Sequence, residues 1–399
     1  MQAYRLISRP RRALATLLAT LLLASAFAAE AAQPVASLDG ISANAIRTAK
    51  PGHLFRIRPQ VGGALNGAAF RVIYRSTGLR GEPVAVSGTI IFPEGAGPKG
   101  GRNIVAWAHY TTGVSQRCAP TLLPNLGGTI PGLDAMLARG YVVVATDYEG
   151  LGVPGVHAYL VGASEAHAVL DSVRAARNLT AAHASNRFAV WGHSQGGHAA
   201  LFTRELAADY APELNLVGIA AAAPATNLVQ LFETQKGSIA GEGLTAMALL
   251  SWSRTYNLPI DSVLEKGVGT RFAKVAESCI QSVSQMLRLL KLAWPLKKEF
   301  LKADPTTLPA WRELMEKNTP DAAARGVPVF IAQGTGDKTV RPQITIAYAK
   351  ALCANGTAVD FKLMKGAPHG YAAEKSAYQA VKWIVDRFKG KTPPSDCAR

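Results

Sequence analysis

The chain has 399 residues, of which 48% are hydrophobic, and its formal net charge at pH 7 is +16. This length allows a large globular core, and the lack of a repeat at a period of roughly 20–50 residues argues against a solenoid or propeller. The charge is explained by solubility alone or, as the alternative, by attraction to anionic partners such as lipid head groups, cell-wall polymers or acidic polysaccharides. Nucleic acid is not expected, because the basic residues are scattered and form no recognition motif.

The first 31 residues have the form of a secretory signal peptide. Four arginines at residues 5–12 are followed by the apolar run "ALATLLATLLLASAFA", and small residues at 26–31 offer cleavage sites. An uncleaved anchor is the alternative, but the run is short for a span of about 20 residues. We therefore expect a secreted or periplasmic protein that has no transmembrane segment after cleavage.

The next segments predict a lead-in and then a mostly parallel sheet. Residues 33–68 predict little regular structure, and residues 69–78 and 82–93 alternate apolar and polar positions, as half-buried antiparallel strands do. From residue 103, continuous apolar runs alternate with helical patterns, which is typical of parallel strands joined by helices. The strands are expected near 103–110, 141–150, 187–193 and 214–224, and the helices near 131–140, 162–179 and 196–208.

This alternation stops at about residue 226 and resumes at about residue 321. Residues 226–320 indicate helices and loops, among them a basic and apolar stretch at 283–302 that Pro295 interrupts. We expect an α/β fold whose core is formed by residues 32–225 and 321–399, with 226–320 inserted as a helical cap. The later strands and helices are expected at 327–337, 344–356, 358–370 and 376–390.

One G-x-S-x-G sequence, Gly192-His193-Ser194-Gln195-Gly196, stands between a predicted strand and a predicted helix. A serine in an ordinary turn is the alternative. The strand-turn-helix context is what a nucleophile elbow requires, because the sharp turn exposes the hydroxyl at a helix N-terminus. The sequence therefore predicts that Ser194 is a nucleophile.

A serine nucleophile needs a base and an acid, in the chain order Ser, Asp or Glu, His. His369, in the loop "KGAPHGY", is the one histidine beyond residue 198. Asp337 follows the predicted strand "VFIAQG" in a glycine-containing turn, which indicates the acid. The other aspartates between Ser194 and His369 lie in helical, cap or strand sequence: Asp209, Asp261, Asp304, Asp321 and Asp360.

Two backbone N–H groups are expected to form the oxyanion hole. Gln195, which follows the nucleophile, supplies one; Thr111, in the loop "HYTTG" after a buried strand, supplies the other, with Tyr110 or Thr112 as alternatives.

Other polar residues near these motifs are given structural roles: His109 shapes the loop, His193 and His198 pack the elbow, and Asp147 and Glu149 hold loops together, with substrate contact as their alternative. No P-loop, dinucleotide-binding or H-E-x-x-H motif occurs, so no cofactor and no metal is implied.

Four cysteines remain after the expected cleavage: Cys118, Cys279, Cys353 and Cys397. An even number in an exported chain favours two disulfides, and the spacing is not that of a zinc site. The spacing alone leaves three connectivities open.

Taken together, the motifs resemble those of the secretory lipases, a family of α/β-hydrolases. The segments "AFRVIYRSTGLRGEPVAVSGTIIFP", "AWAHYTTG" with "CAP", "VVATDYEGLG", "GHSQGGHAA", and "QGTGDKTVRP" with "PHG" occur in the family's order over about residues 45–390. One difference is that the family often has His-Gly-Thr-Thr-Gly where this chain has His109-Tyr110-Thr111-Thr112-Gly113. The bulk of Tyr110 could narrow the acyl site.

The resemblance implies hydrolysis of carboxylic esters by Ser194, Asp337 and His369, and a cap that shapes an acyl pocket. It also implies the disulfides Cys118–Cys279, between oxyanion loop and cap, and Cys353–Cys397 near the C-terminus. The substrate is then a small-molecule or lipid ester, and whether the enzyme is a lipase or an esterase stays open. An amidase or peptidase with the same triad is the alternative. The stretch Met286–Leu301 could contact an anionic lipid surface or pack onto the core.

Overall fold

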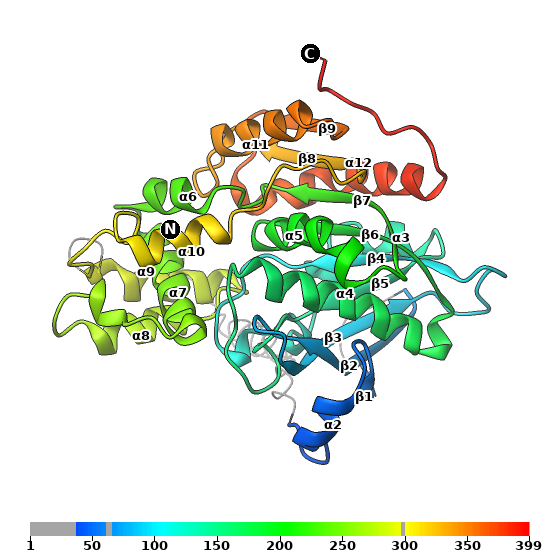
Figure 1. The fold of residues 1–399 in the computed structure, drawn as a ribbon, viewed down its shortest axis with the longest axis horizontal. Helices are drawn as coiled ribbons and strands as arrows, with labels where there is room; N and C mark the ends of the chain where they lie inside the picture. Colours follow the sequence, from blue (N-terminus) through cyan, green and yellow to red (C-terminus); the bar gives the residue numbers. More distant parts are fainter. Residues whose placement is uncertain (1–36, 61–65, 297–299, 399) are drawn as a thin grey trace, which may run out of the picture. The chain divides into compact units, whose positions relative to one another are not determined.

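The computed structural model describes residues 37–60, 66–296 and 300–398. The expected signal peptide, residues 1–31, lies outside the described residues. Within them, the chain forms a nine-stranded sheet in the order β1-β2-β3-β5-β4-β6-β7-β8-β9 (Figure 1). The strands are β1 (Leu54–Pro59), β2 (Ala68–Thr77), β3 (Pro83–Phe92), β4 (Arg102–Ala108), β5 (Val142–Thr146), β6 (Ala184–His193), β7 (Asn215–Ala222), β8 (Val329–Gly334) and β9 (Val359–Met364).

The pairs β1-β2, β2-β3 and β3-β5 are antiparallel. The remaining pairs, from β5-β4 to β8-β9, are parallel. Strands β5 and β8 and the second part of β6, from Phe188 to His193, are buried, because helices cover both faces of the sheet there. The mostly parallel sheet flanked by helices confirms the predicted fold class.

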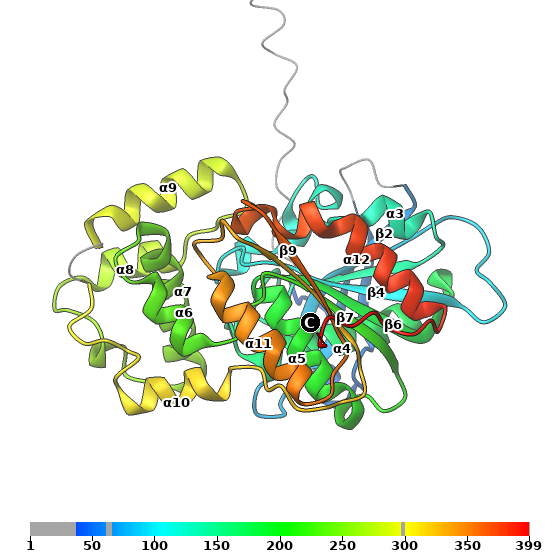
Figure 2. The ribbon, with the colours of Figure 1, turned by 90° about the horizontal axis from the view of Figure 1, so that it is seen from above.

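Helices pack on both faces of the sheet, and each face has its own apolar core (Figure 2). One face is covered by α4 (Gly162–Asn178), α5 (Gln195–Tyr210) and α11 (Pro342–Ala354). The other face is covered by α3 (Leu133–Leu137) and α12 (Ala372–Phe388).

The prediction of little regular structure at residues 33–68 is wrong for two segments. Helix α2 (Ala43–Thr48) begins at Ser42, whose hydroxyl accepts a hydrogen bond from the Ala45 N–H at 3.0 Å. Strand β1 pairs with β2 at the edge of the sheet. An edge strand has a neighbour on one side and an exposed face, so its apolar pattern is weak.

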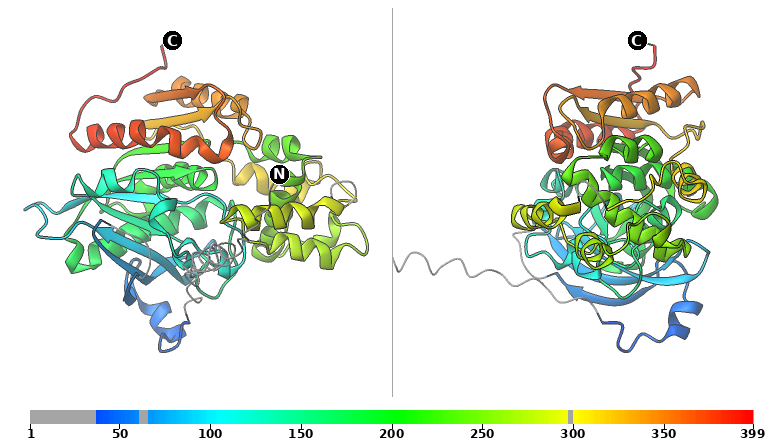
Figure 3. Two further views of the ribbon diagram at one scale, coloured as in Figure 1. Left: turned by 180° about the vertical axis from the view of Figure 1, so that it is seen from behind. Right: turned by 90° about the vertical axis from the view of Figure 1, so that its left-hand side faces the viewer.

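Between β7 and β8 the chain forms a group of helices in residues 226–320, which we call the insertion. Its helices are α6 (Leu228–Gln235), α7 (Ile239–Tyr256), α8 (Gly269–Ala276), α9 (Val283–Ala293) and α10 (Pro309–Lys317). They enclose a separate apolar cluster around Met247, Trp252, Phe272 and Trp311. Figures 1 and 2 and the left view of Figure 3 show the insertion beside the layered part of the molecule and not on a face of the sheet.

The insertion is joined to the sheet at the carboxyl ends of β4 and β8. The Ile280 N–H donates to the Thr112 carbonyl at 2.9 Å, and the Gln235 side chain donates to the Thr339 carbonyl. Disulfides join Cys118 to Cys279 and Cys353 to Cys397, which is the pairing that the resemblance implied. None of the described helices is long and apolar enough to cross a bilayer.

Candidate active site

Ser194 stands on a sharp turn between β6 and α5. Its backbone has φ 58° and ψ −116°, a conformation that side-chain-bearing residues rarely adopt and that is strained. The turn needs glycine on both sides: a Cβ on Gly192 would lie 2.1 Å from the Gly196 carbonyl oxygen, and one on Gly196 would lie 1.8 Å from the Ala108 carbonyl oxygen. The G-x-S-x-G spacing therefore has a steric cause in this fold.

Three loops at the carboxyl ends of β6, β8 and β9 bring Ser194, Asp337 and His369 together. The Nε2 atom of His369 lies 2.9 Å from the Ser194 hydroxyl oxygen, and its Nδ1 atom lies 2.7 Å from an Asp337 carboxylate oxygen. Because a carboxylate accepts, Nδ1 carries the proton, and Nε2 is left to accept the hydrogen of the serine hydroxyl. This is the tautomer that a general base needs.

Asp337 is held by donors from its own loop. One carboxylate oxygen accepts from the backbone N–H groups of Thr339 at 2.9 Å and Val340 at 2.8 Å. The other accepts from the side-chain amide of Gln333 at 3.1 Å as well as from His369. The carboxylate is therefore fixed in its direction toward the imidazole.

His193 lies directly behind the His369 loop. Its Nε2 atom is 3.0 Å from the His369 carbonyl oxygen, and the two rings lie 5.1 Å apart. Burial, together with the nearby His369, lowers the pKa of His193 to about 3. The neutral ring therefore donates Nε2–H to the His369 backbone and supports the loop, which agrees with the packing role expected for it.

The loop after β4 carries the expected oxyanion donor Thr111. The Nδ1 atom of His109 lies 2.6 Å from the Tyr110 carbonyl oxygen, and burial lowers the pKa of His109, so the neutral ring donates to this carbonyl. Since a trans peptide group is planar, the same contact fixes the direction of the Thr111 N–H. The Thr111 hydroxyl lies 3.0 Å from the Tyr159 hydroxyl, which anchors the loop a second time.

Gln195 is the first residue of α5, so its N–H is one of the first-turn groups that have no acceptor within the helix. Its side chain reaches into a buried polar cluster. The Gln195 amide donates to a Glu165 carboxylate oxygen at 2.8 Å, and this oxygen also accepts from the Leu160 N–H at 3.0 Å.

The second Glu165 oxygen lies 2.7 Å from Nδ1 of His198, whose Nε2 lies 2.7 Å from the Asn318 carbonyl oxygen. Both ring nitrogens of His198 therefore face oxygen atoms that accept hydrogen bonds. This buried contact between Glu165 and His198 joins α4, α5 and the residue that follows α10. It was not predicted from the sequence, although Glu165 is an acidic residue on a buried helix.

His157 contacts the same cluster. Its Nε2 lies 3.1 Å from the Gln195 amide nitrogen, and its Nδ1 lies 2.8 Å from the Glu149 carbonyl oxygen. Burial lowers the pKa of His157 to about 4, so the ring is neutral, donates from Nδ1 and accepts at Nε2. The Gln195 side chain is thus held from two directions.

A small cavity lies beside Ser194. It is lined by Thr111, Gln195 and side chains of α6 and α7, among them Leu244 and Ala248, and has about 30 Å³ of free volume. Tyr110 is not among its lining residues; it lines a second cavity of about 710 Å³ together with His193 and Gly370. The bulk of Tyr110 therefore lies away from the cavity beside the serine.

Asp147 and Glu149 accept hydrogen bonds that join neighbouring segments of the chain. Asp147 accepts from the Ser87 hydroxyl at 2.6 Å and from the Thr121 N–H at 3.0 Å, and burial raises its pKa. Glu149 accepts from the Ser164 hydroxyl at 2.6 Å. Among residues 37–60, 66–296 and 300–398, no group of three or more His, Cys, Asp or Glu side chains is placed to hold a metal ion.

The parallel sheet with a serine elbow after β6, and with an acid and a histidine after later strands, defines the chain as an α/β-hydrolase. Solved structures share this fold. Candida antarctica lipase A in its closed state matches with a TM-score of 0.74 at 23% identity, over 89% of this chain and 86% of that one. The rice cell wall degrading esterase LipA from Xanthomonas oryzae matches with a TM-score of 0.69 at 20% identity, over 86% and 98%.

The sequence comparisons identify the family. The secretory lipase profile matches residues 130–396, more than half of the chain, so the chain belongs to the secretory lipase family. It is 28% identical over 351 residues to Lipase A of Arthroderma benhamiae, and the aligned region covers 83% of this chain and 72% of the relative. The chain is accordingly a carboxylic ester hydrolase.

Proposed function

We propose that the chain hydrolyses acyl esters through a covalent acyl-enzyme formed on Ser194. The observation that carries this proposal is the continuous hydrogen-bonded path from the Ser194 hydroxyl through His369 to Asp337, at 2.9 and 2.7 Å. A serine hydroxyl is a weak nucleophile unless a base accepts its proton, and this path supplies the base and the group that orients it.

The reaction begins when His369 Nε2 accepts the Ser194 proton and the serine oxygen attacks the ester carbonyl. The N–H groups of Gln195 and Thr111 stabilise the oxyanion, and Asp337 stabilises the imidazolium. The imidazolium then protonates the leaving alcohol. Water, deprotonated by His369, attacks the acyl-enzyme and releases the acid and the serine.

The small cavity beside Ser194 is proposed to take the acyl chain. Its free volume of about 30 Å³ is room for roughly two water molecules, so short acyl groups fit with the least rearrangement. Longer chains require α6 and α7 to move, and we propose that residues 226–320 act in this way as a movable cap over the site.

The test is the hydrolysis of p-nitrophenyl esters from acetate to palmitate, together with an emulsified triglyceride. Ser194→Ala is expected to lower kcat by at least about 10⁴-fold, and Asp337→Asn by about 10⁴-fold because the imidazole loses its correct tautomer. Ser37→Ala, at an exposed serine outside both the insertion and the site, is the matched control and should keep full activity. Hydrolysis by Ser194→Ala at more than a small fraction of the normal rate would exclude this mechanism.

The alternative is an amidase or peptidase with the same triad, because triad geometry does not fix the leaving group. Rates on matched ester and amide substrates with the same acyl group separate the two. A faster amide reaction would replace the ester proposal while leaving the roles of Ser194, Asp337 and His369 in place.

Contact between α9 and an anionic lipid surface is also proposed. Leu289 and Ala293 are buried in the core of the insertion, whereas Val283, Leu287 and Trp294 are 78%, 61% and 66% exposed. Arg288 and Lys291 lie on the same helix. Apolar side chains flanked by basic ones favour an anionic membrane interface.

We further propose that the protein is secreted or periplasmic. Its disulfides are typical of an oxidising compartment, and residues 1–31 have the form of a signal peptide. Sequencing the N-terminus of the protein recovered outside the cytoplasm tests this, and an intact residue 1–31 segment would contradict cleavage.

A further inference from the structure

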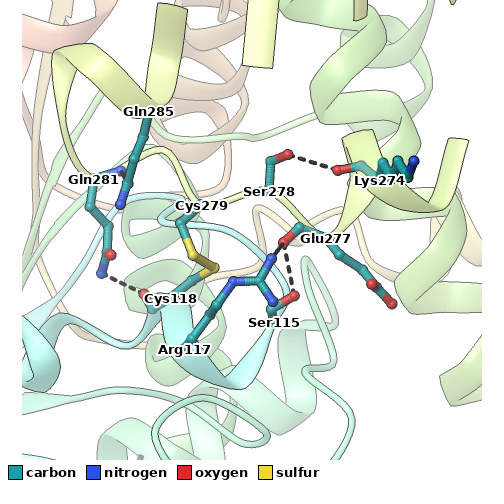
Figure 4. The surroundings of a disulfide bond; sticks show 9 residues. All are labelled: Ser115, Arg117, Cys118, Lys274, Glu277, Ser278, Cys279, Gln281 and Gln285. Carbon is teal, nitrogen blue, oxygen red and sulfur yellow. Dashed lines mark hydrogen bonds between the residues drawn. A yellow bond between two sulfur atoms is a disulfide. The ribbon is translucent and has the colours of Figure 1, made fainter. Parts of the chain in front are cut away.

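A short segment of the insertion lies against the loop that carries the expected oxyanion donor (Figure 4). We call residues 277–281, between α8 and α9, the strap, and residues 109–118, after β4, the oxyanion loop. The disulfide Cys118–Cys279 joins the two covalently. The residues that it joins are 161 positions apart in the sequence.

Hydrogen bonds reinforce this junction on both sides of the disulfide. The Ser115 hydroxyl and the Arg117 guanidinium both donate to the Glu277 carbonyl, at 2.9 and 2.7 Å. The Gln281 side chain donates to the Cys118 carbonyl at 2.7 Å. Each bond crosses from one segment to the other, so the strap follows the oxyanion loop along most of its second half.

The innermost contact reaches the residue next to the expected donor. The Ile280 N–H donates to the Thr112 carbonyl at 2.9 Å. Thr112 is buried and follows Thr111 directly. On its other side, Thr111 is fixed by the contacts of His109 and Tyr159. The oxyanion loop is therefore held by the contacts of His109 and Tyr159 on one side of Thr112 and by the insertion at Thr112 itself.

Gly113 shows how closely the two segments approach. Its φ is +125°, and a Cβ there would lie 2.6 Å from the Cys118 sulfur and 2.7 Å from the Ser278 carbonyl oxygen. A glycine is needed both for the backbone conformation and for the contact between loop and strap.

We propose that the strap is a positioning element for catalysis: it holds the oxyanion loop so that the Thr111 N–H is aimed at the carbonyl oxygen of the substrate. The inference rests on the proposed acyl-enzyme mechanism. Oxyanion donors act when they lie about 2.7–3.1 Å from the oxyanion, and a displacement of about 1 Å can lower a rate by about 100-fold. The insertion thus supports the catalytic machinery as well as covering the site.

The chain offers a matched pair of disulfides for the test. Cys118→Ser/Cys279→Ser removes the strap bridge, and Cys353→Ser/Cys397→Ser removes a bridge between α11 and the C-terminal residues. Both variants are expected to melt at lower temperature than the parent. The strap variant alone is expected to lose about 10- to 100-fold in kcat on p-nitrophenyl acetate, with little change in KM.

A trifluoromethyl ketone reports on the oxyanion site directly. Ser194 adds to its carbonyl carbon, the serine proton passes to His369, and the π electrons become the hemiketal oxyanion. The inhibition constant of the strap variant is expected to rise by the same factor as kcat/KM falls. A general loss of stability would lower the folded fraction and leave the inhibition constant of the folded enzyme unchanged.

Gly113→Ala tests the inference with both disulfides intact, in case the serine variant does not fold. Its control is Gly95→Ala, because Gly95 also has a positive φ, +84°, but a Cβ there would meet no atom within 4 Å. Gly113→Ala should reproduce the rise in inhibition constant and Gly95→Ala should not. Wild-type kcat and inhibition in Gly113→Ala or in the strap variant would overturn the inference, whereas an active Ser194→Ala would overturn the mechanism beneath it.

Discussion

At the scale of single residues, the buried contact between Glu165 and His198 is expected to contribute to stability. The Glu165 side chain is 1% exposed and the His198 side chain is fully buried. Glu165 also accepts from the Gln195 amide and the Leu160 N–H. Its carboxylate therefore has partners on α5 and on the chain before α4.

Glu165→Gln leaves the size of the side chain unchanged but replaces one accepting oxygen with a donating NH2 group, so at least one of the buried hydrogen bonds is lost. We expect the free energy of unfolding to fall by about 1–3 kcal/mol, as when a buried polar group is left without its partner. Urea unfolding measures this. Glu316→Gln, in the exposed Arg312–Glu316 pair, should change stability by less than about 1 kcal/mol. An equal fall in the free energy of unfolding in the two variants would contradict a larger contribution from the buried pair.

The residues proposed for catalysis could be selected from the sequence because each depends on chain order and loop position. Ser194 and Asp337 follow buried strand segments and His369 follows the edge strand β9, and strands can be recognised from the pattern of apolar residues in the sequence. Gln333 and His157 could not be selected in this way, since their roles depend on neighbours distant in the sequence. Glu165 gave a weak signal, as an acidic residue near the start of a helix whose apolar stripe predicts packing against the sheet.

At the scale of elements, α9 has an inner face that packs and an outer face that is exposed. The sequence predicted either core packing or lipid contact for this stretch. Core packing is confirmed for the inner face, and lipid contact stays a prediction for the outer face. Leu287→Glu is expected to weaken binding to vesicles that contain phosphatidylglycerol by about tenfold or more, because burying a leucine contributes about 1.5–3 kcal/mol. Binding should also weaken as salt is raised.

Vesicle sedimentation measures this binding, with Leu363→Glu as the control. Leu363 is 51% exposed on β9, far along the chain from the insertion, so the same substitution there should leave binding unchanged. A Leu287→Glu protein that binds vesicles as well as the parent would contradict lipid contact through α9.

The alternation of strands and helices was readable from the sequence because buried parallel strands are continuous apolar runs. The exceptions were α2 and β1, which lie at the sheet edge and bury little. Helix α2 has six residues, none of them buried, so its formation depends on the Ser42 cap and on contacts with the rest of the molecule. Such an element leaves no periodic pattern in the sequence.

At the scale of the whole molecule, stability is expected to depend on pH through Glu205. This residue of α5 contacts Asp321, at which the chain leaves the insertion and re-enters the core. Its carboxylate accepts from the Asp321 N–H at 2.7 Å. Burial, and then the charge of Asp321, raise the pKa of Glu205 from 4.5 to about 7. A carboxyl whose pKa is raised in the folded state contributes stability below pH 4.5, and this contribution is lost as the pH rises through about 7.

Raising the pH from 5 to about 8 is therefore expected to lower the free energy of unfolding through Glu205 by at most about 3 kcal/mol. His193 and His157, whose pKa values are lowered, act in the opposite direction, since acid favours the unfolded state below pH 6.5. The difference between the parent and Glu205→Gln at each pH isolates the carboxyl. Glu233→Gln, on exposed surface, should show no such pH-dependent difference. A difference in unfolding free energy between the parent and Glu205→Gln that stays constant with pH would contradict the role of Glu205.

The order of the elements along the chain also has a consequence for the protein during its synthesis on the ribosome. Ser194 and His369 are separated by 175 positions, and β8 and β9, which precede the proposed acid and base, follow the insertion in the chain. On the proposed mechanism, a ribosome-bound chain that ends before β9 contains the serine nucleophile but lacks its base. Ester hydrolysis would then begin only after the last strand has joined the sheet.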